Sequence, residues 1–80
     1  MMINGYDIPE IAFFENGNVF TGSEGKSFRY RLANFDGKLQ AWVWYDDICF
    51  ELCTDPISET FELSNDALPN AMDWIFSQKK

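Results

Sequence analysis

The sequence predicts a single α+β domain over residues 1–80, in which an antiparallel β-sheet of about five to six strands, in meander order, carries one C-terminal α-helix packed on a face. Three observations support this fold class. An Asp36-Gly37 pair joins two runs of β-prone residues. The apolar residues change to a helical spacing after Leu63. The chain has only 80 residues, of which 46% are hydrophobic and 18% aromatic, so it can build one small core and is not disordered.

The first third of the chain is expected to supply a lead-in and a first β-hairpin. Scattered apolar residues and an Asn4-Gly5 turn signal indicate an irregular lead-in over residues 1–9. Within residues 10–22, an Asn16-Gly17 pair separates IAFFE from NVFTG, which predicts a hairpin. The short polar connection that follows favours an antiparallel neighbour as the next strand.

The run from Phe28 to Tyr45 predicts the central hairpin of the sheet. Asp and Gly both tolerate the positive φ angles of a two-residue type I′ loop, so Asp36 and Gly37 set the register of the two strands. Counting outward from this loop gives the residue pairs. We assign to an apolar core face the pairs Phe28 with Tyr45, Tyr30 with Val43, Leu32 with Ala41, and Phe35 with Lys38.

The same register places two arginines opposite two tryptophans on the other face. Arg31 faces Trp42 and Arg29 faces Trp44, and each cation–π contact at this spacing contributes about 0.5–2 kcal/mol. Trp and Arg also dominate binding hot spots. Two interpretations stay open. Either the helix or the first hairpin covers this face and the indoles are core, or the face is exposed and binds a partner or a second copy of the chain.

Two further strands are predicted after the central hairpin. Beyond a turn at Asp46-Asp47, the run Ile48–Cys53 alternates in a way that predicts a strand with Phe50 on its buried side. An Asp55-Pro56 turn then precedes a short edge strand over residues 59–63, whose charges suit an edge.

A C-terminal helix is predicted from its capping residues and its spacing. Ser64, Asn65 and Asp66 are capping types, and Pro69 is tolerated only in a first turn, so the helix should begin near residues 66–68. About twelve residues do not form a stable helix alone in water, so it must pack on the sheet. Its apolar face comprises Leu68, Ala71, Met72, Ile75 and Phe76.

The net charge of −7 is distributed unevenly. Between Leu39 and Gln78 there is no Lys or Arg. We expect this acidic surface to bind a protein partner with a basic surface and no nucleic acid directly, because phosphate backbones are bound by clustered Lys and Arg. The alternative is that the surplus acid only keeps the protein soluble. The acidic residues of this segment are Asp46, Asp47, Glu51, Asp55, Glu59, Glu62, Asp66 and Asp73.

The residue types argue against catalysis, a metal or a cofactor. The chain has no histidine, and its two cysteines supply at most half of a structural zinc set. Cys49 and Cys53 would lie about 13 Å apart on one strand, beyond disulfide reach. With no signal peptide and no apolar span for a membrane, we expect a non-enzymatic cytoplasmic protein with no membrane interaction.

In size and charge, though in no residue motif, the chain is similar to the small phage-borne inhibitors of bacterial defence systems, including anti-CRISPR proteins, several of which mimic DNA. This resemblance implies an inhibitor that acts as a nucleic-acid mimic on a nucleic-acid-binding complex, encoded by a phage or mobile element, and it assigns no site residue. The alternative is an ordinary small cytosolic domain that homodimerises through its aromatic sheet face. A hydrolase with paired carboxylates is the third and weakest class.

Overall fold

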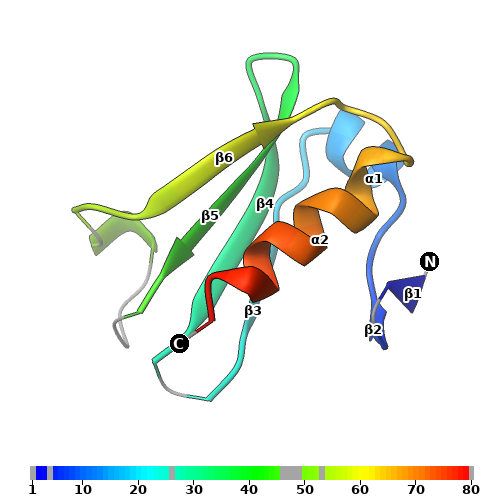
Figure 1. Cartoon of the computed structure of the whole chain (residues 1–80). Coiled ribbons are helices and arrows are strands. Elements are labelled where there is room, and N and C mark those ends of the chain that lie inside the picture. The colour runs from blue at the N-terminus through cyan, green and yellow to red at the C-terminus, as the bar shows by residue number, and fades with distance from the viewer. Residues whose placement is uncertain (1, 4, 26, 46–49, 53, 80) are drawn as a thin grey trace.

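The computed structural model describes residues 2–3, 5–25, 27–45, 50–52 and 54–79 and has the predicted α+β architecture (Figure 1). Strands β3 to β6 form one antiparallel sheet in meander order, and β1 and β2 form a separate two-stranded pair. The main sheet thus has four strands, slightly fewer than predicted. The elements are β1 (Met2–Ile3), β2 (Tyr6–Asp7), α1 (Ile11–Glu15), β3 (Phe20–Ser23), β4 (Arg29–Phe35), β5 (Lys38–Trp44), the 3-10 helix η1 (Phe50–Leu52), β6 (Ile57–Phe61) and α2 (Ala67–Ser77).

The turn of the central hairpin has the predicted conformation. Asp36 and Gly37 have φ angles of +56° and +81°, as a type I′ loop requires, and the backbone N–H of Gly37 donates to Oδ1 of Asn34 at 3.2 Å. The resulting register pairs Arg29 with Trp44, Tyr30 with Val43 and Arg31 with Trp42, which confirms the predicted pairing.

One residue of this hairpin was assigned to the wrong face. Phe35 was placed on the core face, but it is 60% exposed and its ring centroid lies 6.2 Å from that of Trp42. Strand side chains alternate with a period of two, so Phe35 must share a face with Arg31, four residues earlier. The pair of Phe35 with Lys38 is observed, but on the face opposite the core.

The predicted first hairpin is wrong, because IAFFE forms the short helix α1. Ile11 and Phe14 lie three residues apart on one helical side, and Phe14 is fully buried. Gly17, at a φ of +87°, follows the end of the helix, a position where glycine is as favourable as in a hairpin turn. The backbone N–H of Ile11 donates to Oδ1 of Asn65 at 2.9 Å, so a residue far along the chain satisfies the start of this helix.

The predicted strand at 48–53 is also wrong where the structure describes it. Residues 50–52 form η1, in which Phe50 is half-buried and Leu52 is 67% exposed. The turn at residues 46–47 and both cysteines lie outside the described residues. The last strand spans Ile57–Phe61 rather than 59–63, because its pairing with β5 runs from Ile57 opposite Val43 to Phe61 opposite Leu39. It is an edge strand, as predicted.

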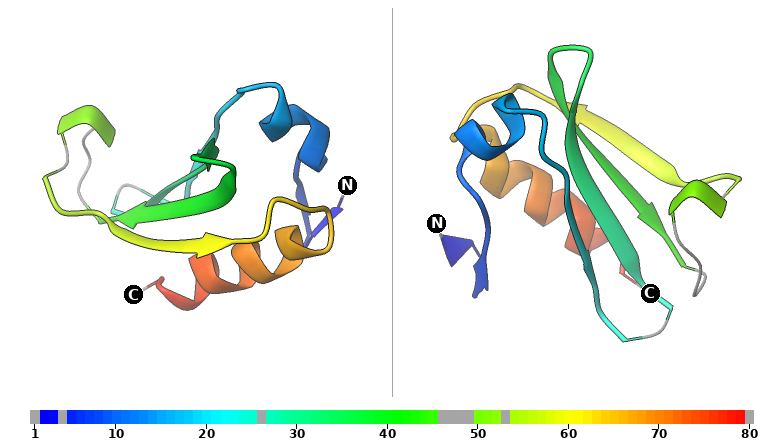
Figure 2. Two further views of the ribbon diagram at one scale, coloured as in Figure 1. Left: turned by 90° about the horizontal axis from the view of Figure 1, so that it is seen from above. Right: turned by 180° about the vertical axis from the view of Figure 1, so that it is seen from behind.

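Helix α2 covers the sheet face that carries Tyr30 and Val43. It begins at Ala67, whose backbone N–H donates a hydrogen bond to Oγ of Ser64 at 3.3 Å. Pro69 lies in its first turn, as predicted. Seen from above in Figure 2, α2 lies on one side of the sheet and η1 on the other. Each fully buried aliphatic side chain in such a core contributes about 1.5–3 kcal/mol. The fully buried residues include Leu32, Leu39, Ala41, Val43, Leu68, Ala71, Met72 and Ile75.

No helix in the described part of the chain is long and apolar enough to cross a membrane.

Gly22 on β3 is required by the ring of Tyr30, its cross-strand partner. The Cβ atom of an alanine at this position would overlap Cζ and Oη of Tyr30 and would lie 2.8 Å from Cε2. We expect Gly22→Ala to destabilise the protein by about 1–3 kcal/mol in urea unfolding, as overpacking does. In a Tyr30→Leu background, where those three atoms are absent, the same change should cost less than about 1 kcal/mol. Equal costs in both backgrounds would rule out this contact as the cause.

Candidate functional site

The face opposite α2 carries the four residues that the sequence grouped as a candidate binding surface. Arg29 and Arg31 on β4 lie opposite Trp44 and Trp42 on β5, and we call these four residues the arginine–tryptophan face. β3 extends it, since Thr21 pairs with Arg31 and Ser23 with Arg29. Two hydroxyl side chains and two guanidinium groups therefore stand side by side on one surface of the sheet.

Neither α2 nor the segment predicted as the first hairpin covers this face, but Phe50 of η1 covers part of it. The Phe50 ring centroid lies 5.3 Å from that of Trp42 and 5.5 Å from that of Trp44. Trp44 is only 6% exposed, whereas Trp42 is half-buried. Of the two interpretations, buried core or exposed binding face, the first therefore applies to Trp44 and the second to Trp42. Trp44 belongs to a small second cluster of rings, and Trp42 lies at its margin.

Arg31 is held on this face mainly by aromatic rings. Its guanidinium carbon lies 4.3 Å from the centroid of Phe50 and 5.4 Å from that of Trp42, so the predicted cation–π contact with Trp42 is present. Its Nη1 atom is 4.0 Å from Oε1 of Glu51, whose side chain is 75% exposed. An ion pair this exposed contributes about 0–1 kcal/mol, less than two ring contacts together. Glu51 can therefore leave without releasing Arg31.

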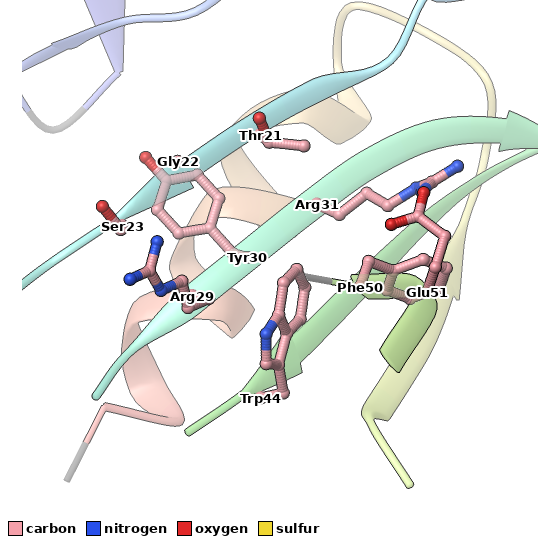
Figure 3. Close-up of a pocket in the computed structure, with 9 residues that line it drawn as sticks. All are labelled: Thr21, Gly22, Ser23, Arg29, Tyr30, Arg31, Trp44, Phe50 and Glu51. Atoms are coloured by element: carbon pink, nitrogen blue, oxygen red, sulfur yellow. The ribbon is translucent and has the colours of Figure 1, made fainter. Parts of the chain in front are cut away.

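The arginine–tryptophan face contains a pocket of about 320 Å³ between β3, β4, β5 and η1. Figure 3 shows the guanidinium groups of Arg29 and Arg31 on either side of the Trp44 indole. The lining comprises residues 21–23 of β3, residues 29–31 of β4, Trp44, Phe50 and Glu51. Positive and hydroxyl groups thus line a pocket with an aromatic wall.

Tyr30 lines the pocket from its place on β4, but its ring lies on the α2 side of the sheet, with its centroid 5.7 Å from that of Phe76. Burial raises the pKa of Tyr30 above its ordinary value of 10, and the negative charge of Glu24 raises that pKa further. The phenol therefore stays protonated at neutral pH, and its O–H group can still donate a hydrogen bond.

The acidic residues singled out from the sequence do not gather at one point. Glu51 is in η1 beside Arg31, while the other described members lie on β6, on α2 and in the segments next to them. Among the described residues, no group of three or more His, Cys, Asp or Glu side chains could hold a metal ion. Asp46 and Asp47 fall outside the described part. The described members, all exposed, are Glu51, Asp55, Glu59, Glu62, Asp66 and Asp73.

Sequence reasoning missed three residues of this site. Phe50 was expected in the core of the sheet, and Thr21 and Ser23 were not singled out. The alternation of Thr21 and Ser23 along a strand was a usable signal, because both must point to the same side. For Phe50, the sequence offered only the indirect indication that two neighbouring tryptophans on one sheet face require another apolar side chain to pack against them.

The burial of Trp44 can be tested against the exposed Phe35 on the same face. We expect Trp44→Ala to lower the free energy of unfolding by about 3 kcal/mol or more, since a large buried ring is lost. Phe35→Ala, at a 60% exposed position, should cost less than about 1 kcal/mol. Urea unfolding followed by circular dichroism gives both values. If the two variants are equally stable, Trp44 is a surface residue and the described ring cluster does not form.

The comparisons with known proteins identify no relative. No family model matches the chain, and searches of curated proteins and of solved structures find no match either. The function must therefore be argued from the surfaces and the pocket themselves.

Proposed function

We propose that this chain is a small non-enzymatic interaction protein whose acidic C-terminal half binds a basic surface on a protein partner. The observation that carries the proposal is the exposure of every described carboxylate between Leu39 and Gln78, in a segment with no Lys or Arg. Because the segment itself contains no Lys or Arg, it carries a net negative charge that can attract a basic partner.

Four of these carboxylates lie on or next to two elements that contact each other, β6 and α2. Asp66 and Asp73 are seven residues apart, two helical turns, and both are exposed on the side of α2 that faces away from the buried residues. Glu59 is on the edge strand β6, and Glu62 follows that strand. Helix α2 and strand β6 are in contact, and the ring centroids of Trp74 and Phe61 lie 6.3 Å apart. The two elements therefore lie side by side. We call Glu59, Glu62, Asp66 and Asp73 the acidic surface.

A nucleic-acid-binding site is the specific partner surface that we propose. Such sites present clustered Lys and Arg, to which the exposed carboxylates of the acidic surface are complementary in charge. The small size and negative charge of the chain, similar to those of phage-borne inhibitors of defence systems, suit an inhibitor of this kind. The protein would then occupy the basic site as a nucleic-acid mimic and would not bind nucleic acid itself.

Charge reversal on the acidic surface tests the proposal. Glu59→Lys with Glu62→Lys should abolish capture of a basic host protein by this chain as bait, whereas Glu10→Lys with Glu15→Lys should leave it intact. Each double variant changes the net charge from −7 to −3, because each substitution adds two positive charges. For the captured protein, association should slow as salt rises, because rim charges act mainly on association rates.

Two results would contradict the proposal. Equal loss of binding in both double variants would mean that net charge alone matters, and binding that is insensitive to salt would mean that the acidic surface is not used. The alternative function, homodimerisation through the arginine–tryptophan face, rests on the 60% exposure of Phe35 beside Trp42. Light scattering over a range of concentrations distinguishes it, because the proposed inhibitor stays monomeric at 9.3 kDa.

A further inference from the structure

The pocket on the arginine–tryptophan face has a chemistry opposite to that of the acidic surface. The chain contains only two arginines, and both line this one pocket. We propose that the pocket binds a small ligand with an oxyanion, a carboxylate or a phosphate, attached to a flat apolar body. This site is independent of the proposed acidic surface, which lies on other elements.

Donors for an oxyanion come as two pairs, one on each side of the Trp44 indole. Thr21 and Ser23 on β3 stand directly opposite Arg31 and Arg29 on β4, so that each guanidinium has a hydroxyl as its cross-strand neighbour. Guanidinium groups donate to oxyanions in pairs of parallel hydrogen bonds, and they remain charged at every working pH. Charge-assisted hydrogen bonds of this kind are about twice as strong as neutral ones.

The apolar wall and the volume define the rest of the ligand. Trp44 and Phe50 line the pocket beside the donors. A volume of about 320 Å³ is near the lower end of small-molecule sites, which span roughly 300–1,000 Å³. The pocket therefore suits a single ring or a short chain that bears the anion, rather than an extended peptide.

Arg31 is oriented before any ligand arrives, and its present carboxylate partner is weak. Phe50 and Trp42 fix the guanidinium by stacking, at 4.3 Å and 5.4 Å from the ring centroids. The Nε atom of Arg31 is buried with no hydrogen-bond acceptor among the described residues. Glu51 approaches Nη1 only to 4.0 Å and is 75% exposed. A ligand oxyanion can thus take the place of Glu51 at the rim without moving Arg31.

Titration with matched small molecules tests the site. Two-dimensional amide NMR spectra of the whole chain would be recorded with benzoate, phenyl phosphate, inorganic phosphate and the neutral benzamide. We expect benzoate or phenyl phosphate to shift the amide signals of Thr21, Gly22, Ser23 and Arg31 in a saturable manner. Benzamide should bind at least about tenfold more weakly, because it lacks the charge that the arginines recognise. Tighter binding of phenyl phosphate than of benzoate assigns the phosphate, and the reverse order assigns the carboxylate.

Single substitutions separate the site from a general charge effect. Arg31→Gln should weaken the better ligand by at least about tenfold, whereas Lys79→Gln, beyond the end of α2, removes the same charge and should change nothing. Glu51→Gln, at an exposed position, should tighten binding by about two- to fivefold because the competing carboxylate is gone. Equal binding of benzamide and benzoate, or a Glu51→Gln variant that binds no better, would overturn the proposal.

Discussion

The type I′ turn at Asp36 and Gly37 is the constraint on which the rest of the structure depends. With both residues at positive φ, the strands on either side can pair in only one register. A shift by one residue would exchange the two faces of the hairpin and bring Arg31 under α2 in place of Tyr30. A charged group buried there without a partner costs several kcal/mol, a large share of the stability of an 80-residue domain.

This register separates two kinds of packing. On the α2 side, aliphatic and aromatic residues of sheet and helix form the main apolar core. On the other side, rings from β5 and η1 enclose the stems of charged side chains, so the arginine–tryptophan face remains partly accessible and polar. The acidic surface on β6 and α2 and the arginine-lined pocket consequently lie on different parts of the molecule. One small domain thereby presents two surfaces of opposite charge, each suited to a different class of ligand.

Local signals predicted the elements whose neighbours in space are also neighbours in sequence. The central hairpin follows from Asp36-Gly37, and α2 follows from its capping residues and apolar spacing. The sequence also allowed the correct face to be predicted for Phe35, because side chains alternate between the two faces along a strand. The helix α1 was not, because glycine at Gly17 serves a helix end as well as a hairpin, and the choice depends on packing of Phe14 and on Asn65. The pocket was equally out of reach, because it requires η1 to fold back over β5, a contact that no short motif encodes.

A nuclear Overhauser spectrum of the protein in solution tests the central claim most directly, because it reports the register and the cover of the arginine–tryptophan face together. Tyr30 and Val43 form a pair without mutual hydrogen bonds in a hairpin with a two-residue loop, so their Hα atoms should give a strong cross-peak. The ring protons of Phe50 should give cross-peaks to the indole protons of Trp42 and Trp44. Cross-peaks from Phe50 to the methyl groups of Val43, with none between Tyr30 and Val43 Hα atoms, would contradict the account.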